Sequence, residues 1–198
     1  MHKPTHPPPL ILASTSRYRA ELLRRLGVDF ATVSPEIPED PHPGEDAHAL
    51  TRRLAGDKAA AVARVHPDAV VIGSDQVAEF QGRIIGKPGT VERACAQLLE
   101  FSGQTVRFLT AVSLQRESSG LKLDELVVTE IHFRELRAAE VQRYVEHDQP
   151  LDCAGSFKSE RAGPVLMRGM RADDPTAIIG LPLIAVSGML RQAGFVLP

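Results

Sequence analysis

The chain has 198 residues, of which 43% are hydrophobic and 24% are charged, a balance that suits one globular domain with a substantial core. Its 23 basic and 25 acidic residues give a net charge of −2, which argues against a nucleic-acid polymer as partner. Two cysteines outside any CxxC spacing argue against a disulfide scaffold and favour a cytoplasmic protein. No apolar run reaches the roughly 20 residues of a membrane helix, so we expect no membrane partner.

The first nine residues, MHKPTHPPP, differ in composition from the rest of the chain. They contain no hydrophobic signal-peptide core and predict a disordered tail over residues 1–9. No later segment is a linker long enough to separate two domains, so we expect residues 10–198 to form a single domain.

The first half of the chain alternates between strand-like and helical segments. The run LILA at residues 10–13 predicts a buried strand, and apolar positions four apart predict a helix over residues 16–26. Residues 34–46 are rich in proline and acid and predict a loop, whereas residues 47–65 predict a long helix. Residues 69–75, AVVIGSD, predict a short buried strand that enters a turn.

The second half continues the alternation. Residues 81–89 predict a hairpin or loop, and residues 91–101 predict a helix with one apolar stripe. Residues 106–115 and 125–136 alternate between apolar and polar positions, which predicts a pair of antiparallel strands. A helix over residues 138–147 is expected to follow.

The last segments complete the fold class. Residues 152–163 predict a loop, and Pro182 opens a final helix that ends near Gly194. Because strands and helices interleave throughout, the sequence predicts an α/β fold with a mixed, twisted sheet flanked by helices.

The helix expected after the first strand begins with an unusual charge pattern. A helix N-terminus exposes unpaired N–H groups and partial positive charge, so acidic side chains are favoured in its first turn. Here the hydroxyls of residues 14–16 are followed by Arg17 and Arg19. Hydroxyls, free N–H groups and arginines together suit a phosphate group. The alternative is that Ser16 only caps the helix while both arginines point into solvent.

Three further charged residues suit phosphate chemistry. Asp75 is expected at the carboxyl end of its strand, where a carboxylate can bind a divalent cation or activate water; the alternative is a turn former. Lys87, between Gly86 and Pro88, can contact a phosphate, although its segment lacks the spacing of a P-loop. Lys58 lies on an otherwise apolar helix stripe, and its alternative is a snorkelling surface lysine.

The loop predicted at residues 152–163 carries the third cluster of charge. It contains Lys158, Glu160 and Arg161, and Gly155 and Gly163 make it flexible. Cys153 is expected in the core, because no arginine follows it at the spacing of a cysteine phosphatase loop.

Seven sequence blocks, in this order, resemble the Maf family of nucleoside triphosphate pyrophosphatases. They are LILASTSRYRAELLRRLG, PEIPED, RLAGDKA, GSDQV, GKP, CAGSFKSE and GLPLIAVSGMLR, and they cover nearly the whole chain after the tail. GSDQV together with CAGSFKSE resembles the subgroup that hydrolyses 7-methyl-GTP, rather than the subgroup acting on dTTP and UTP.

This resemblance implies a two-lobed architecture related to that of inosine triphosphatase, usually in a homodimer. It also implies a nucleotide substrate, release of pyrophosphate, and a divalent metal cation such as Mg²⁺, Mn²⁺ or Co²⁺. The role would be to keep modified nucleotides out of nucleic-acid synthesis.

The resemblance also implies roles for single residues. Asp75 matches the proton acceptor, and Glu39 matches a loop carboxylate that would bind the metal together with Asp75. The positions that handle phosphate are Ser14, Arg19, Lys58 and Lys87. The positions that select the base are Tyr18, Gln76 and Glu160. Lys158 is a further loop residue that we expect to bind substrate.

The sequence departs from the family pattern at three positions. Arg17 replaces a proline, Tyr18 replaces a tryptophan, and Pro38 stands where an aspartate commonly precedes Glu39. The first two changes bear on base preference and the third on the metal site.

The sequence leaves two alternative functions open. One is a dTTP or UTP pyrophosphatase, which Gln76 and Glu160 argue against. The other is a nucleotide-binding regulator of septum formation. The presence of Asp75 and Lys87 argues against a regulator that has lost catalytic activity.

Overall fold

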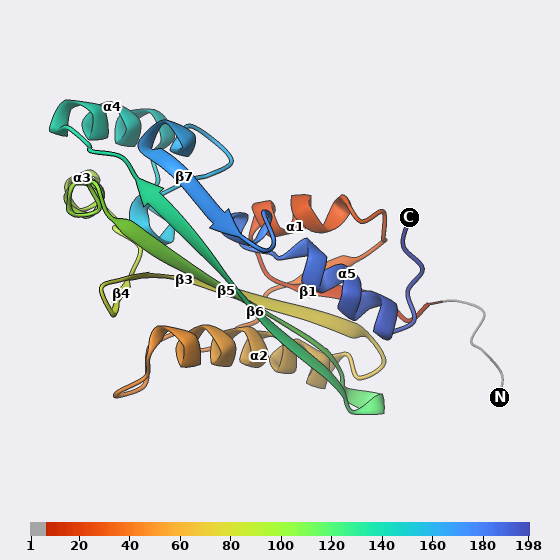
Figure 1. Ribbon diagram of the computed structural model, residues 1–198. Coiled ribbons are helices and arrows are strands. Elements are labelled where there is room, and N and C mark those ends of the chain that lie inside the picture. The colour runs from red at the N-terminus through yellow and green to blue at the C-terminus, as the bar shows by residue number, and fades with distance from the viewer. Residues whose placement is uncertain (1–6) are drawn as a thin grey trace.

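In the computed structural model, which describes residues 7–198, a mixed sheet of seven strands crosses the molecule (Figure 1). The strand order is β2-β1-β3-β5-β6-β7, with β4 paired to β3 off this path. Strand β1 pairs in parallel with β2 and β3, and all other pairs are antiparallel. The strands are β1 (Leu10–Ala13), β2 (Ala31–Val33), β3 (Val70–Phe80), β4 (Arg83–Ile85), β5 (Thr105–Arg116), β6 (Leu121–Phe133) and β7 (Met167–Ala172).

Five α-helices surround the sheet, which confirms the predicted α/β fold with a mixed sheet. Helix α2 lies along one face, α1 and α5 cover the other face near the chain termini, and α3 and α4 lie at the far end (Figure 1). The α-helices are α1 (Arg17–Arg24), α2 (Ala47–Val65), α3 (Val91–Glu100), α4 (Ala138–Asp148) and α5 (Leu183–Gln192). The short 3₁₀ helices are η1 (Glu117–Ser119), η2 (Ala154–Ser156), η3 (Gly163–Leu166) and η4 (Ala177–Ile179).

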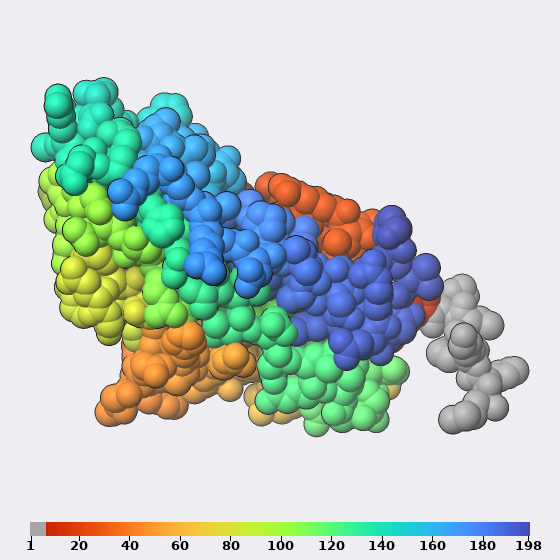
Figure 2. Space-filling view, viewed as in Figure 1, coloured from red at the N-terminus to blue at the C-terminus, as the bar shows by residue number. Residues whose placement is uncertain are grey.

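The two ends of the long strands have separate hydrophobic cores. One core packs α1 and α5 against β1 and the first half of β3, and includes Leu22 and Ile72. The other packs α3 and α4 against the second half of β3, and includes Phe80 and Leu98. In the space-filling view, the segments that carry α3 and α4 lie at one end of an elongated molecule and the segment that carries α5 lies toward the other end (Figure 2). On the other face, α2 packs against β3 in two further clusters, one with Val71 and one with Val77. The centre of β3 therefore lies between hydrophobic clusters on both faces.

Strand β3 is longer than the sequence predicts. Asp75 was expected in a turn after the strand, but it lies in the middle of β3, opposite Ala111 of β5. The turn-like residues GSD stay extended because the strand goes on to pair with β4 and β5 through Phe80, and tertiary pairing outweighs local preference.

The edges of the sheet and the chain start also differ from expectation. Strands β2 and β7 were not predicted; both are edge strands whose residues are all exposed or half-buried. Residues 1–6 of the predicted tail lie outside the described residues, whereas the carbonyl of Pro9 already accepts a hydrogen bond from Val70. No helix in the described part of the chain is both long and apolar enough to cross a membrane.

Candidate active site

A cavity of about 1000 Å³ opens at the centre of β3, between the two hydrophobic cores. Its walls come from the start of α1, the loop before α2, α2 itself, the segment after β4, the loop after α4, and η4. All ten residues predicted from the sequence line this cavity: Ser14, Tyr18, Arg19, Glu39, Lys58, Asp75, Gln76, Lys87, Lys158 and Glu160.

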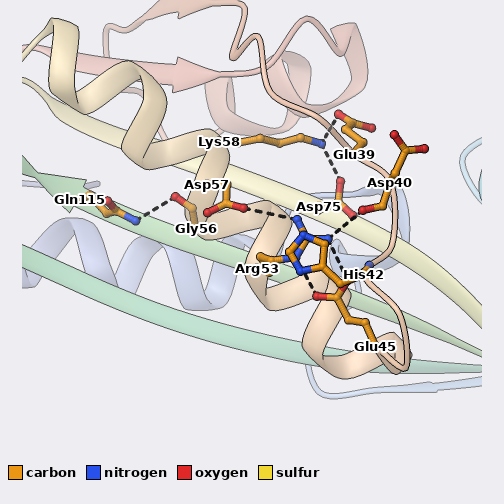
Figure 3. A network of polar contacts seen from close by, with 10 residues as sticks. All are labelled: Glu39, Asp40, His42, Glu45, Arg53, Gly56, Asp57, Lys58, Asp75 and Gln115. Carbon is orange, nitrogen blue, oxygen red and sulfur yellow. Dashed lines mark hydrogen bonds and ion pairs between the residues drawn. The ribbon is translucent and has the colours of Figure 1, made fainter.

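A lysine that lies between two carboxylates lines the cavity (Figure 3). Lys58 Nζ lies 2.6 Å from Asp75 Oδ1 and 2.8 Å from Glu39 Oε1. Lys58 and Asp75 are buried, so Lys58 is not a snorkelling surface lysine. Burial of Glu39 acts to raise its pKa, but the hydrogen bond from Lys58 and the charges of Lys58, Lys87 and Arg19 bring the pKa below its ordinary value. Glu39 is therefore an anion at neutral pH.

Close packing at Gly73 places Lys58 beside Asp75. A Cβ on Gly73 would collide with the backbone of Ala55 and Ala59, so helix α2 lies directly on β3 at this point. Side chains two residues apart on a strand share a face, so Asp75 points toward the same helix. Lys58 is the neighbour of Ala59, which contacts Gly73, so its side chain starts close to β3 and its ammonium contacts Asp75.

Substitution Gly73→Ala is expected to lower the free energy of unfolding by about 1–3 kcal/mol, because the added methyl group overpacks the α2–β3 contact. It should also lengthen the contact between Lys58 and Asp75, because α2 must move away from β3. Denaturant unfolding measures the change in stability. Gly56→Ala is the control, since nothing lies within 4 Å of its added Cβ. Equal unfolding midpoints for the two variants would contradict this account of the packing.

The two arginines at the start of α1 have different environments. Ser16 caps the helix by accepting a hydrogen bond from the backbone of Arg19. The Arg19 guanidinium turns inward, where Nε donates to the carbonyl of Gly180 at 2.9 Å and Nη1 lies 3.5 Å from Ser14 Oγ. Burial lowers the pKa of Arg19, and the charges of Asp75 and Glu39 oppose that effect. Ser16 therefore caps the helix, as the alternative interpretation expected, but Arg19 points into the cavity and not into solvent.

Arg17 covers the ring of its neighbour Tyr18. The Arg17 guanidinium lies 4.8 Å from the ring centroid and donates to the Tyr18 hydroxyl at 2.9 Å. Tyr18 is half-buried and packs into none of the hydrophobic clusters of the described residues. The ring is thus part of the cavity wall and already holds one cationic group.

Gln76 points away from Asp75 toward the C-terminal part of the chain. Its amide nitrogen, with two N–H donors, lies within hydrogen-bond distance of three acceptors: Thr110 Oγ1 at 2.9 Å and the carbonyls of Ala177 and Ile178 at 2.9 and 3.1 Å. The nitrogen is therefore fully engaged with protein, and the amide oxygen is the atom left for a ligand.

A salt bridge attaches the loop that carries Glu39 to helix α2 (Figure 3). Arg53 donates to both carboxylate oxygens of Glu45 at 2.7 and 2.8 Å and to the carbonyl of Asp40 at 3.1 Å. The Arg53 bond, together with the backbone N–H of His42, lowers the pKa of Glu45 to about 2. Sequence reasoning missed this pair, although Arg53 stands within the RLAGDKA block.

Residues 9–193 match the family model described as Maf-like protein. The chain belongs to the Maf family. The resemblance seen in seven sequence blocks is thereby confirmed over almost the whole length of the chain.

Curated Maf relatives match the chain at high identity. A protein of Xanthomonas axonopodis pv. citri named 7-methyl-GTP pyrophosphatase is 55% identical over 191 residues, covering 96% of this chain and 100% of the relative. Proteins of the same name from Aromatoleum aromaticum and Bordetella avium are 52% and 50% identical, covering 96% and 94% of this chain and 97% and 94% of the relatives. Among solved structures, the Ham1 protein of Staphylococcus aureus matches with a TM-score of 0.44 at 15% identity, covering 63% of this chain and 71% of that chain.

The Maf cavity provides two carboxylates that can share a cation. Asp75 Oδ1 and Glu39 Oε1 both contact Lys58 Nζ, so the two carboxylates lie close together. Within residues 7–198 no group of three or more His, Cys, Asp or Glu side chains could hold a metal. Mg²⁺ typically uses one or two protein carboxylates and completes its shell with substrate phosphates and water. Asp75 and Glu39 fit that pattern, and Pro38 leaves the loop without a carboxylate directly before Glu39.

Cys153 lines the same cavity and is half-buried instead of lying in the core as expected. Burial, with a smaller contribution from Asp152, raises the pKa of its thiol to about 12. A thiol with that pKa stays protonated at neutral pH, and only the thiolate is a good nucleophile. Cys153 therefore does not act as the nucleophile of this site.

Proposed function

We propose that this Maf protein is a nucleoside triphosphate pyrophosphatase that hydrolyses 7-methyl-GTP to 7-methyl-GMP and pyrophosphate. The observation that carries the proposal is the buried carboxylate of Asp75 in a cavity also lined by Lys58, Arg19 and Lys87. The names of the curated relatives support the choice of nucleotide. From the Maf resemblance we also infer a homodimer that acts in the cytoplasm.

Asp75 is the group placed to accept a proton from water. Lys58 donates to its Oδ1 atom, and no side chain among the described residues donates to Oδ2, so Oδ2 can face a water molecule in the cavity. That water attacks the α-phosphorus, its proton passes to Asp75, and the bond from the α-phosphorus to the bridging oxygen breaks. The bridging oxygen leaves with pyrophosphate. Positioning and charge neutralisation supply most of the rate in such transfers.

The cations surround the place where negative charge grows on the leaving group. Arg19 is held by Gly180, and Lys58 by Asp75 and Glu39, so both charges are already in position before substrate binds. Fixed charges of this kind stabilise a transition state more than mobile ones. Lys87 is exposed at the rim and provides a point charge for the outer phosphates. A divalent cation such as Mg²⁺, Mn²⁺ or Co²⁺ would be held by Asp75 and Glu39, and it would supply further neutralisation and lower the pKa of bound water.

Base selection falls to Tyr18, Gln76 and Glu160. Methylation at N7 leaves a positive charge on the guanine ring, and such a ring gains about 0.5–2 kcal/mol from stacking on an aromatic face such as that of Tyr18. Arg17 covers one face, so the base uses the other face or displaces Arg17. Glu160 is exposed at the cavity and can accept both N1–H and N2–H of guanine. Uracil presents one N–H between two carbonyl oxygens and fits that carboxylate poorly.

The proposed substrate predicts a ranking of nucleotides. With Mg²⁺ or Mn²⁺, wild-type protein should give the highest kcat/KM with 7-methyl-GTP, then GTP, then UTP. Glu160→Gln should lower kcat/KM for the two guanine nucleotides by about 10- to 100-fold, the cost of losing a charged hydrogen-bond partner, and should spare UTP. Pyrophosphate release measures all three.

Glu117→Gln is the matched control, because Glu117 is exposed on η1 outside the cavity. A wild-type preference for UTP would reject the proposed substrate in favour of the dTTP and UTP subgroup. Nucleotide binding without turnover would favour a regulator instead. If Glu160→Gln leaves kcat/KM of the two guanine nucleotides relative to UTP unchanged, the guanine pocket alone is rejected.

A further inference from the structure

Lys158 has an environment that differs from the other cations of the cavity. Its side chain is only 7% exposed, and Nζ donates to the carbonyls of Asp148 and Gln149 at 3.1 and 3.0 Å. These carbonyls belong to the C-terminal end of α4, where backbone oxygens lack helical partners and carry partial negative charge. Asp152 Oδ1 lies 3.5 Å from the same Nζ. The ammonium is therefore engaged with protein and does not face a substrate.

The chain around Lys158 is tied to the last turn of α4 at several points. The backbone N–H of Lys158 donates to the Tyr144 hydroxyl at 2.9 Å, and the N–H of Ala162 donates to Asp148 Oδ2 at 2.9 Å. The Asp148 carboxylate is completely buried and also lies 3.6 Å from Arg161 Nε. Residues 158 and 162, on either side of Glu160, are thus both anchored to one helix end.

The loop closes tightly on itself between these anchors. The carbonyl of Lys158 accepts a hydrogen bond from Gly163 at 3.0 Å, and a Cβ on Gly163 would collide with that carbonyl and with the Phe157 ring. Glu160, in the middle of the loop, is exposed at the cavity and has no ion-pair partner among the described residues. The loop is rigid at its base and presents one free carboxylate.

We propose that Lys158 is a positioning residue: its buried ammonium holds the loop against the end of α4 and so fixes where Glu160 meets the base. This inference rests on the proposed function. Removing an ammonium from water is costly, and a buried charge is kept only where hydrogen bonds offset that cost. The two carbonyls do so here, in a geometry that an apolar side chain of equal length cannot reproduce. A carboxylate that must accept two hydrogen bonds at once tolerates little displacement, so a loose loop loses discrimination between bases.

The test is Lys158→Met, made in wild type and in Glu160→Gln, with kcat/KM measured for 7-methyl-GTP, GTP and UTP. In the wild-type background we expect the 7-methyl-GTP to UTP ratio to fall about tenfold, mainly through KM of the guanine nucleotides. In the Glu160→Gln background the ratio should not fall further, because the carboxylate that Lys158 positions is already gone. A merely structural lysine would not show this dependence on Glu160.

Two further variants complete the experiment. Lys122→Met removes the charge of an exposed lysine on β6 and should leave the ratio unchanged. Tyr144→Phe removes only the hydroxyl that accepts the Lys158 N–H, so it should give a smaller fall in the same direction and remains informative if Lys158→Met does not fold.

The possible outcomes separate the two proposals. An unchanged ratio in both Lys158→Met and Tyr144→Phe would overturn the positioning role while the proposed function stands. An equal loss for all three nucleotides would overturn it too, and would indicate contact with the shared phosphates. A wild-type protein without guanine preference would overturn the proposed substrate itself, and this inference with it.

Discussion

Asp75→Asn is expected to reduce turnover by about 100- to 10,000-fold, the usual effect of removing a general base. The amide is close in size to the carboxylate but accepts no proton from water. Lys58 keeps its contact with Glu39 at 2.8 Å in this variant, so no buried charge is left without a partner. We therefore expect a small loss of stability and nearly unchanged nucleotide binding, with the loss confined to kcat.

Pyrophosphate release, calorimetry with nucleotide, and denaturant unfolding test the three parts of this expectation. Asp57→Asn is the control, because Asp57 is exposed on α2 next to Lys58 and its only ion-pair partner among the described residues is Arg53, at 3.5 Å. If purified Asp75→Asn keeps more than about a tenth of wild-type turnover, Asp75 is not the base.

The elements predicted best are those whose pattern is local. Helix α2 has the predicted bounds, because Asp46 caps it and its apolar positions recur at helical spacing up to its end. Strand β1 is likewise as predicted, since LILA is buried at every position. Both segments carry enough information in their own residues to define a start and an end.

The elements missed are those that depend on distant partners. Strand β7 reads MRGMRA, with exposed and half-buried positions only, and it forms because β6 offers an edge for pairing. Asp75 was misplaced at a strand end for a related reason, because the continuation of β3 depends on its pairing with β5, in which Ala111 lies opposite Asp75.

The site follows the same division. The chemical types of Asp75, Lys58 and Arg19 and the motif blocks were sufficient to predict which residues gather in one cavity. The orientation of Lys158 toward the end of α4 was not predictable, because it depends on how the loop folds back onto that helix. The carbonyl of Gly180, which orients Arg19, lies 161 residues away and has no side chain to signal its role.

Lys58→Met is expected to lower both stability and turnover, in contrast to Asp75→Asn. It leaves the Asp75 carboxylate, which is only 10% exposed, without its closest cation. Breaking a buried pair in this way typically costs about 3–5 kcal/mol, because the remaining charge stays desolvated. The asymmetry arises because Glu39 is 55% exposed and can compensate Lys58 at little cost, whereas Lys58 is the only ion-pair partner of Asp75 among the described residues.

Turnover of Lys58→Met should fall by about 100- to 1000-fold, the usual effect of removing a fixed charge that stabilises the transition state. Denaturant unfolding and pyrophosphate release measure both effects, with Lys122→Met as the surface control and Lys58→Arg as the variant that keeps the charge. Partial recovery in Lys58→Arg would show that the charge matters, since arginine differs from lysine in shape and in the direction of its donors. If Lys58→Met unfolds at the same denaturant concentration as Lys122→Met and keeps turnover within about tenfold of wild type, then Lys58 neither compensates Asp75 nor stabilises the leaving phosphates.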